Sequence, residues 1–243
     1  KLLPSIFFFF FTQINILIVT IIASFQASAV SYLYYADWIY QINLAIAGIA
    51  IGVVILPQLS KHIQSRKKNK ISLIQNKALE LSLFLSIPSA VALIIASEEI
   101  VSALFGYGSF NQVGVKNTAL AVFYFAMGLP AFSIAKIFLS FSFARHNTKM
   151  PFYTSLASVI LNIIISVSFF SLIGFIIIPI ATTISAWVHT ILLFYFLKKD
   201  ELFNFNKAFF DRFIRIIFSV ILMGIFFNFI INFFENNLAY EEN

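Results

Sequence analysis

One carboxylate inside a long apolar segment is the residue best suited to do chemistry in this sequence. Asp37 lies in Tyr34-Tyr35-Ala36-Asp37-Trp38, one to two turns into an apolar run. A charged side chain near membrane depth costs at least a few kcal/mol, so it is expected to face a cavity or a partner. The alternative is that Asp37 lies close enough to the membrane surface to stay hydrated. We predict that Asp37 belongs to a substrate cavity.

Two further residues of this segment are assigned to the same predicted cavity. Ser31 and Tyr35 precede Asp37 by about one and a half turns and half a turn, so they can line the cavity mouth. Tyrosines at that depth are also ordinary anchors at the membrane interface. Both interpretations stay open for Tyr35.

A lysine in another apolar run is the only cation predicted at depth. Lys136 lies near the end of its run. Its ammonium group can meet a phosphate from inside a helix bundle. It can equally snorkel to the membrane surface along its aliphatic stem. We assign Lys136 to the predicted substrate cavity.

A group of neutral polar residues forms a second candidate site. Asn162 and Ser166 are four residues apart and therefore share one helix face, and Thr182 lies in the next apolar run. Such residues can supply oxygen ligands to an ion. They can also simply form hydrogen bonds between helices.

No catalytic or cofactor signature accompanies these residues. Cysteine is absent, and His62, His146 and His189 fall on separate segments without metal-ligand spacing. There is no phosphate-binding glycine-rich loop, HExxH helix or GxSxG turn. We therefore predict no metal site, no cofactor and no enzymatic activity. Basic residues gather in the joins between apolar runs, so the net charge of +6 requires no nucleic-acid partner.

The elements that must position these residues are membrane-spanning helices. Hydrophobic residues make up 60% of the 243 residues and charged residues 11%, too few to cover a water-exposed domain. A helix needs about 20 apolar residues to cross the bilayer. The sequence predicts an all-α, polytopic transmembrane bundle with about seven spans, at 4–26, 31–57, 77–97, 117–140, 151–173, 175–197 and 212–234.

The joins between these runs predict how the chain is threaded through the membrane. Basic joins alternate with joins that carry only Lys116, as seven consecutive crossings require. Because basic loops stay in the cytoplasm, residue 1 is predicted to be cytoplasmic and the C-terminus to lie outside. The joins at 60–77 and 198–215 are each predicted to be amphipathic, the first including a short interfacial helix. Both are expected to contact anionic lipid rather than a specific head group.

Local features inside the runs predict how the helices pack. Gly48 and Gly52, with Ala45 on the same face, allow a second helix backbone to approach closely. Pro88, Pro130 and Pro179 lie inside apolar runs, where neighbouring helices or water must satisfy the freed carbonyl groups.

Several short motifs in order resemble the MurJ (MviN) family of lipid II flippases. The chain carries Val30-Ser31-Tyr32-Leu33-Tyr34-Tyr35-Ala36-Asp37, followed by Gly52-Val53-Val54-Ile55-Leu56-Pro57-Gln58-Leu59-Ser60. These are similar to the family's YYADR segment and its G-x-x-x-LP-x-LS pattern. The turn Ala144-Arg145-His146-Asn147-Thr148-Lys149-Met150-Pro151 looks like the family's AR-x-D-T-K-T-P turn, and Lys136 stands where the family usually has a lysine.

The resemblance implies a function and a larger protein. The chain would be the C-terminal half of a fourteen-helix transporter of the MOP superfamily, with the MATE-like fold. Residues 1–197 would form its second six-helix lobe, 198–211 a cytoplasmic connector, and 212–243 a further span with an outer tail. The implied activity is the flipping of a lipid-linked peptidoglycan precursor across the bacterial inner membrane by alternating access. The implied partners are that precursor, the membrane lipids and the N-terminal lobe.

Two departures from the family pattern change what is expected of the site. Trp38 stands where the family usually has an arginine after the aspartate. Some members resemble a sodium-binding pattern with two carboxylates, and the corresponding positions here look like Val19 and Ser166. A site without carboxylates should bind sodium poorly. We therefore expect no tight sodium site, and a proton gradient or membrane potential as the energy source.

Three alternatives to the flippase remain at this stage. The first is another lipid-linked oligosaccharide or multidrug transporter of the same superfamily. The second is a membrane scaffold without a transport path, since intramembrane charges are sparse. The third, a membrane enzyme acting on lipid phosphate, would need clustered acids or histidines that the sequence does not show.

Overall fold

A computed structural model describes the backbone of residues 2–108 and 110–241, and the side chains of 13–108 and 110–234. Within these residues the chain forms helices and short turns and no strands. A helix satisfies its own backbone hydrogen bonds, which lipid cannot do. The elements are α1 (Leu2–Ser24), α2 (Ala29–Leu44), the π-helix η1 (Ala45–Ala50), α3 (Ile51–Gln64), α4 (Lys68–Ile95), α5 (Ser97–Phe105), α6 (Gln112–Phe143), α7 (Lys149–Ile173), the 3-10 turn η2 (Gly174–Ile176), α8 (Ile177–Lys199) and α9 (Lys207–Glu241).

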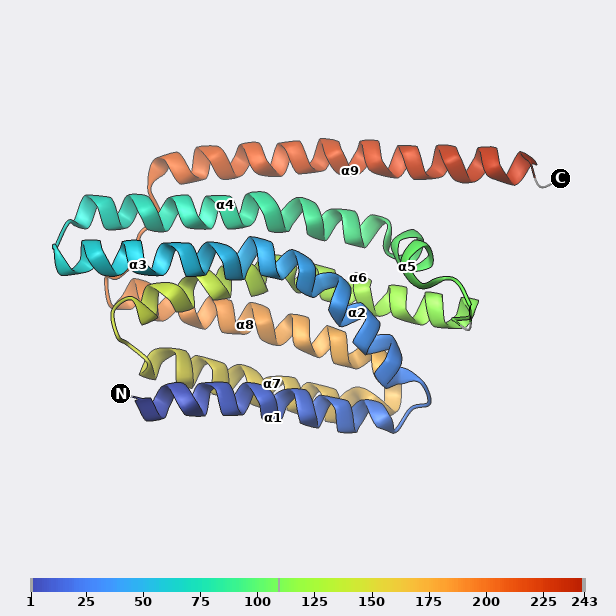
Figure 1. Ribbon diagram of the computed structural model, residues 1–243, viewed down its shortest axis with the longest axis horizontal. Helices are drawn as coiled ribbons and strands as arrows, with labels where there is room; N and C mark the ends of the chain where they lie inside the picture. Colours follow the sequence, from blue (N-terminus) through green and yellow to red (C-terminus); the bar gives the residue numbers. More distant parts are fainter. Residues whose placement is uncertain (1, 109, 242–243) are drawn as a thin grey trace.

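Seven long helical rods lie side by side, because α2, η1 and α3 form one continuous helix (Figure 1). By length and hydropathy, five described segments could cross a membrane, and one of these, 149–199, contains both α7 and α8. These two helices fold back on each other at Gly174, whose φ is 72°. The described apolar part of α1, Gln13–Ser24, is shorter. The prediction of an all-α, multi-span bundle is confirmed.

The joins between the helices lie in two groups, one at each end of the bundle (Figure 1). The turns at 65–67, 144–148 and 200–206 lie at the end where α1 begins. The α1–α2 turn, α5, the α7–α8 turn and the end of α9 lie at the opposite end. Arg66 and Tyr107 are therefore at opposite ends, as the alternation of basic and non-basic joins predicts.

The predicted interfacial helix between 60 and 77 is not a separate element. Helix α3 continues to Gln64 and α4 begins at Lys68, so only three residues separate them. Arg66 has a φ of 53°, and this left-handed residue lets the chain reverse within a short turn. Ile71 and Ile74, which produced the amphipathic pattern, pack against the core. The pattern therefore reflects the buried face of a long helix.

The connector between α8 and α9 is also different from the prediction. Only residues 200–206 lie outside the two helices, and Phe203 within them is 2% exposed, so this side chain belongs to the core. The Arg145 guanidinium donates to the Leu202 carbonyl at 2.9 Å, and the Gln75 amide donates to the same oxygen at 3.1 Å. The Asn76 side chain donates to the Asn204 carbonyl at 3.0 Å. Side chains of α4 and the α6–α7 turn thus satisfy the non-helical backbone of the connector.

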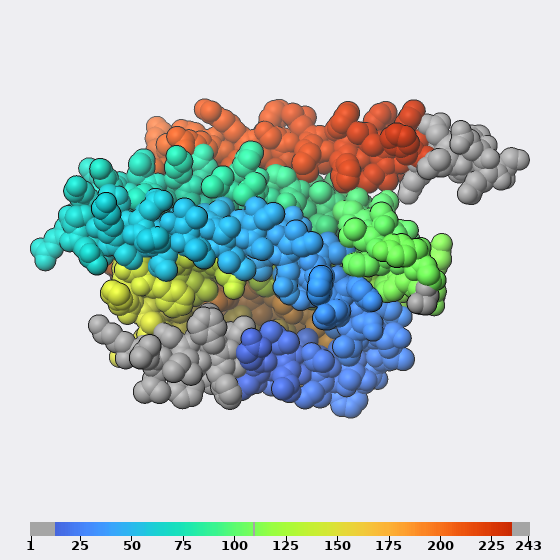
Figure 2. Space-filling view, in the orientation of Figure 1, coloured from blue at the N-terminus to red at the C-terminus, as the bar shows by residue number. Residues whose placement is uncertain are grey.

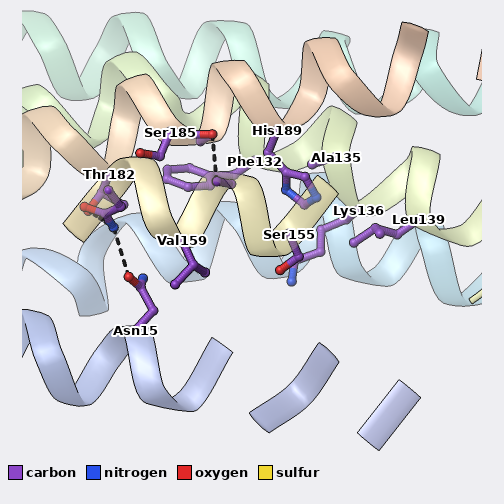
Figure 3. A pocket seen from close by; sticks show the side chains of 13 residues that line it. Asn15, Phe132, Ala135, Lys136, Leu139, Ser155, Val159, Thr182, Ser185 and His189 are labelled. Carbon is purple, nitrogen blue, oxygen red and sulfur yellow. Dashed lines mark hydrogen bonds between the residues drawn. The ribbon is translucent and has the colours of Figure 1, made fainter. Parts of the chain in front are cut away.

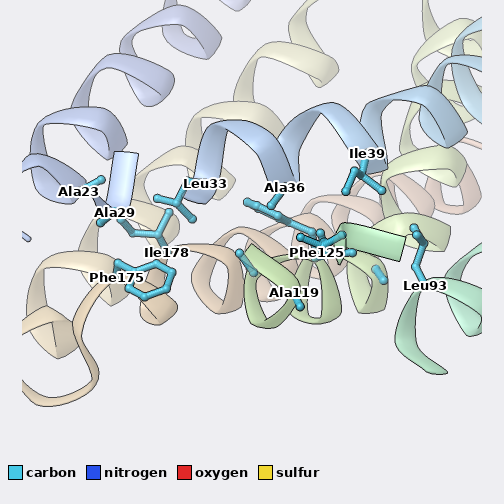
Figure 4. Close-up of a cluster of buried hydrophobic side chains, with 14 of the residues drawn as sticks. Ala23, Ala29, Leu33, Ala36, Ile39, Leu93, Ala119, Phe125, Phe175 and Ile178 are labelled. Atoms are coloured by element: carbon cyan, nitrogen blue, oxygen red, sulfur yellow. The ribbon is translucent and has the colours of Figure 1, made fainter. Parts of the chain in front are cut away.

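Two buried hydrophobic clusters form the core, one toward each end of the bundle. The cluster beside α2 packs small residues such as Ala29 and Ala36 against larger side chains such as Phe125 and Phe175 (Figure 4). The other cluster includes Phe138 and the connector's Phe203. Helix α9 packs along α4, and most of its large apolar side chains remain exposed.

The three prolines predicted inside apolar runs fall into two groups. Pro88 and Pro130 lie inside α4 and α6, as expected. Pro179 is the third residue of α8, where its missing N–H would have no intrahelical partner in any case. Pro179 therefore leaves no donor to be replaced by neighbouring helices.

Candidate functional site

A pocket of about 170 Å³ lies between α1, α6, α7 and α8. On one face of the molecule a recess separates the α2–α3 helix from α1, with atoms of α8 visible at its floor (Figure 2). Most of the pocket's polar lining comes from two helices with side chains at helical spacing. The polar lining residues are Asn15, Lys136, Ser155, Ser158, Asn162, Thr182, Ser185 and His189 (Figure 3).

The spacing of these residues explains why they meet. Ser155, Ser158 and Asn162 recur every three to four residues along α7, so they form a stripe on one face. Helix α8 has the same spacing at 182, 185 and 189, and it packs against α7. The Ser158 hydroxyl donates to the Ser185 carbonyl at 2.9 Å, which joins the two stripes.

The three residues of the predicted polar cluster lie together, and two of them, Asn162 and Thr182, line this pocket. The Ser166 hydroxyl donates to Asn162 Oδ1 at 3.2 Å. The Asn162 amide nitrogen donates to Thr182 Oγ1 and to Asn15 Oδ1, each at 3.4 Å. Asn162 is 3% exposed and Ser166 is fully buried. These bonds connect three helices, which is the structural role expected of polar residues at depth.

Asn15 is a member of this cluster that the sequence analysis did not identify. It lies on α1, in the apolar segment Gln13–Ser24, and faces Thr182 across the pocket in Figure 3. An amide inside an otherwise apolar run was the available signal. Its partner could not be predicted, because Asn162 is 147 residues away in sequence.

Lys136 joins this pocket and not the region of Asp37, with which it was grouped by sequence. Figure 3 shows Lys136 beside Ser155 and His189 at one end of the pocket. Its side chain is exposed in the isolated chain, and none of the residues lining the pocket is acidic. The ammonium group therefore has no carboxylate partner among the lining residues.

Close helix packing shapes the wall of the site next to Lys136. A Cβ added at Gly48 would lie 3.2 Å from the Ser133 Cα and 3.4 Å from the Lys136 Cγ. A Cβ at Gly52 would lie 2.8 Å from the Ser140 hydroxyl. The close approach predicted from the glycine pair is confirmed, and α6 is the helix that approaches.

Asp37 lies outside the pocket, near the middle of α2. Its carboxylate is half-buried and accepts hydrogen bonds from the Gln41 amide and the Tyr40 hydroxyl. The Tyr40 ring stacks on Phe132, with centroids 5.5 Å apart, and Phe132 also lines the pocket. A packed pair of aromatic rings thus lies between the carboxylate and the pocket.

The other residues predicted near Asp37 have different surroundings. Ser31 is exposed. The Tyr35 ring packs against Phe105 and Phe110, with centroids 4.8 and 5.2 Å away, which fits the anchoring alternative. Trp38 is 59% exposed on the open side of α2. The structure therefore does not gather Ser31, Tyr35 and Lys136 around one pocket.

The side chains present are poorly suited to hold a metal ion. Among residues 13–108 and 110–234 no three His, Asp or Glu side chains come together. The polar cluster contains amides and hydroxyls, and Val19, at one position of the family's carboxylate pair, packs against the hydrophobic core. Hard cations such as calcium and magnesium are typically bound with the help of carboxylate oxygens.

The family model described as "Lipid II flippase MurJ" matches residues 1–242 of this chain. The chain is 38% identical over 183 residues to a probable lipid II flippase MurJ of Rhizobium meliloti (strain 1021), covering 75% of this chain and 34% of that protein. It is 36% identical over 189 residues to a probable lipid II flippase MurJ of Rickettsia prowazekii (strain Madrid E), covering 78% and 37%. The chain thus spans about a third of the length of these curated relatives.

A solved structure described as lipid II flippase MurJ in an inward closed conformation has a similar fold. The TM-score is 0.78 with 24% sequence identity, over 99% of this chain and 53% of that chain. An outward-facing multidrug resistance transporter of the MATE family also superimposes, with a TM-score of 0.68 and 16% identity, over 88% of this chain and 49% of that one. These two likenesses show that the chain shares its fold with about half of each of these proteins.

Proposed function

We propose, on the premise that this chain belongs to the lipid II flippase MurJ family, that it forms the C-terminal half of a flippase. The whole protein would move an undecaprenyl-pyrophosphate-linked peptidoglycan precursor across the bacterial inner membrane by alternating access. The observation that carries the proposal is the match of the family model to residues 1–242, and a pocket with polar side chains between four long apolar helices is consistent with it.

The arrangement of the charged residues supports a path between two lobes. Asp37 lies toward the end of the bundle that holds the α1–α2 turn, whereas Lys136 lies toward the end that holds the α6–α7 turn. We assign Asp37, with Ser31 and Tyr35, to the outer entrance of the cavity. We assign Lys136 to the cytoplasmic side, where its ammonium group attracts the pyrophosphate.

The orientation in the membrane follows from the same separation. All Lys and Arg residues except Lys1, Lys116 and Lys136 lie in or beside the three joins at one end of the bundle. The positive-inside rule assigns that end to the cytoplasm. Residue 1 would then be cytoplasmic and the C-terminus of the chain periplasmic.

The absence of carboxylates in the polar cluster bears on the energy source. The groups around Asn162 are amides and hydroxyls, so a proton gradient or the membrane potential would drive turnover. Replacing sodium by choline in a flipping assay on the natural-length protein should leave the rate unchanged. Loss of flipping on sodium removal alone would contradict this part of the proposal.

Complementation tests the transport roles directly. The natural-length protein would be expressed in a bacterium depleted of its own flippase, as wild type and as Asp37→Ala and Lys136→Ala. Both variants should fail to support growth at wild-type expression, and Lys116→Ala, an exposed lysine on the same helix α6, should support it. Normal growth with both Asp37→Ala and Lys136→Ala would overturn the roles and favour a scaffold without a transport path.

A further inference from the structure

The rod formed by α2, η1 and α3 is divided at its middle. The residues of η1, Ala45–Ala50, form a π-turn, whereas α2 and α3 are regular α-helices. Figure 1 shows α2 inclined to α3. A π-turn inside an α-helix is a place where the helix bends. The two parts also belong to different cores, because α2 packs in the cluster that contains Phe125 and α3 in the cluster that contains Phe138.

Helix α4 has a break of its own at the same level. Pro88 lacks the N–H group that would bond to the Phe84 carbonyl, which weakens the helix there. The turn at 65–67 folds α4 back along α3, and both helices rise equally per residue, so Pro88 lies close to Leu44, the last residue before η1. Helix α4 also packs against η1. The two breaks are therefore neighbours.

Three buried hydroxyl groups at this level have no hydrogen-bond partner within the described residues. They belong to Ser82 and Ser86 of α4 and Ser133 of α6, all fully buried. By the same register Ser82 and Ser86 lie opposite the two ends of η1, and a Cβ added at Gly48 of η1 would lie 3.2 Å from the Ser133 Cα. An unpaired buried donor is costly. A backbone carbonyl released by bending can accept from these hydroxyls, which lowers the cost of the bend.

The helices around this level are fastened unequally. Three side chains of α8 donate to carbonyl groups of α6 on both sides of Pro130: Thr183 to Tyr124, Trp187 to Met127 and Thr190 to Ala131. These bonds hold α6 to α8 across the proline. By contrast, Gln41 and Asn43 of α2 bond within their own helix, to Asp37 and to the Ile39 carbonyl. Apolar packing, which has no fixed direction, attaches α2 to its neighbours.

We propose that η1 and Pro88 form a hinge, about which α2 and the outer part of α4, with α5, tilt as one unit relative to α6 and α8. The inner part of α4 stays fixed, because Gln75 and Asn76 bond to the α8–α9 connector. Asp37 lies on the tilting unit and Lys136 on α6, so the hinge changes the separation of these two charges. The inference goes beyond the transport proposal, since the lobe changes shape and does not only rock as a rigid body.

Contacts among apolar side chains join the parts of the tilting unit. The Tyr35 ring of α2 packs on Phe105 of α5, with centroids 4.8 Å apart, and Val101 of α5 belongs to the same cluster as Leu93 of α4. Helix α2 has 16 residues and is therefore about 24 Å long. A bend of about 20° at η1 would move its far end by roughly 8 Å.

Distances between spin labels test the hinge in the natural-length protein in lipid nanodiscs. One label pair spans the outer end of the lobe, at Glu99 of α5 and Leu172 of α7. The other spans the inner end, at Lys70 of α4 and Tyr153 of α7, and all four side chains are exposed. Double electron–electron resonance should give a distance distribution that is wider by about 5 Å or more for the outer pair than for the inner pair.

Restoring regular helices should remove this excess width. Deleting Ile49 removes the extra residue of the π-turn, and Pro88→Ala restores the missing N–H group. The combined variant should give outer and inner distributions of equal width, and Pro88→Ala alone should remove part of the excess. Pro179→Ala is the matched control and should keep the wild-type widths, because the third residue of α8 has no intrahelical acceptor for its N–H group.

Two results would overturn the proposal. The first is an outer distribution as narrow as the inner one in the wild-type protein. The second is an outer distribution that keeps its full width both in Pro88→Ala and in the combined variant, which would assign the motion to α5 alone. If the combined variant does not fold, the width measured in Pro88→Ala decides between these outcomes.

These outcomes are separable from failure of the flippase proposal. A protein that supports growth of the depleted strain but has an immobile outer end keeps the transport function and loses the hinge. A protein with the wide outer distribution that never supports growth has the reverse result.

Discussion

Two pockets of similar volume, about 170 and 180 Å³, lie on opposite sides of the α6–α8 helix pair. The first opens toward α1 and α7, and polar side chains from four helices contribute to its lining beside apolar ones such as Phe132 and Leu139. The second lies toward α4 and the start of α9, and carbon atoms dominate its lining, with Phe138, Phe194, Phe205 and Phe209. Within one turn of α6, Lys136 lines the first pocket and Phe138 lines the second.

The two pockets also differ in what their polar atoms do. In the apolar pocket the Thr190 hydroxyl donates to the Ala131 carbonyl at 2.8 Å, and the Trp187 indole donates to the Met127 carbonyl at 3.2 Å. In the polar pocket the Ser185 hydroxyl and His189 Nε2 have no partner in the described chain. The comparison teaches that polar residues join the helices on both sides of the pair, whereas, of the two linings, only that of the polar pocket contains buried polar atoms without a partner in the described chain.

The largest expected effect separates packing from polarity at neighbouring positions of α6. Phe138 is 2% exposed and contacts the rings of Phe141, Phe194 and Phe203, so Phe138→Ala should cost about 3–5 kcal/mol of unfolding free energy. Lys136→Met should change it by less than about 1 kcal/mol. Denaturant unfolding in detergent measures both. If the two variants lost the same unfolding free energy, Phe138 would not differ from Lys136 as a packing residue.

A methyl group at Gly48 should disturb the wall next to the polar pocket. The Ser133 backbone, 3.2 Å from the added Cβ, cannot rotate away, so we expect Gly48→Ala to cost about 1–3 kcal/mol. Ile49→Ala, at an exposed neighbouring position, provides the control and should cost less than about 1 kcal/mol. Thermal unfolding in detergent compares them, and an unchanged midpoint in Gly48→Ala would refute the close contact.

In the apolar pocket the Thr190 hydroxyl is already paired, so its removal should lower the stability of the protein. Thr190→Val keeps the shape of a 5% exposed side chain and removes its bond to the Ala131 carbonyl. We expect a loss of about 0.5–1.5 kcal/mol in unfolding free energy. Thr190→Ser, which keeps the hydroxyl group, should lose less unfolding free energy than Thr190→Val.

The smallest expected effect comes from the unpaired hydroxyl of the polar pocket. Ser185→Ala removes a group that has no partner in the described chain, so the free energy of unfolding should change by less than about 0.5 kcal/mol. Denaturant unfolding in detergent measures this change. A loss as large as that of Thr190→Val would show that the Ser185 hydroxyl has a stabilising partner.

The hydropathy of the sequence was sufficient to predict the helices and the ends to which their joins belong. Apolar length determines a span, and neither property depends on distant contacts. The sequence also predicted that Asn162 and Ser166 share a face and that Gly48 allows close packing, because both follow from helical spacing. These predictions are local, and the structure agrees with them.

The features that sequence reasoning could not place depend on contacts between distant segments. Phe203 lies in a stretch rich in charged and polar residues, and it is buried against rings of α6 and α8 and against Phe205 of the connector. Lys136 was grouped with Asp37 because both are charged residues within apolar runs, whereas helix packing turns Lys136 toward Ser155 and His189. Asn15 acquires its role only through Asn162. Spacing along one helix cannot indicate which other helix its face will meet.

The π-helix from Ala45 to Ala50 changes the phase between the two halves of the helix that carries Asp37. Each residue of an α-helix advances the side-chain direction by about 100°, and a π turn accommodates one residue more than the regular repeat. A helical wheel drawn without interruption through residues 29–64 would therefore place Leu59 on the wrong side relative to Leu33, although both are buried. Deleting one residue at this point would remove the residue that the π turn accommodates, so a regular α-helix would leave α3 with the face that now packs against α6, and Gly52 would stay at that contact.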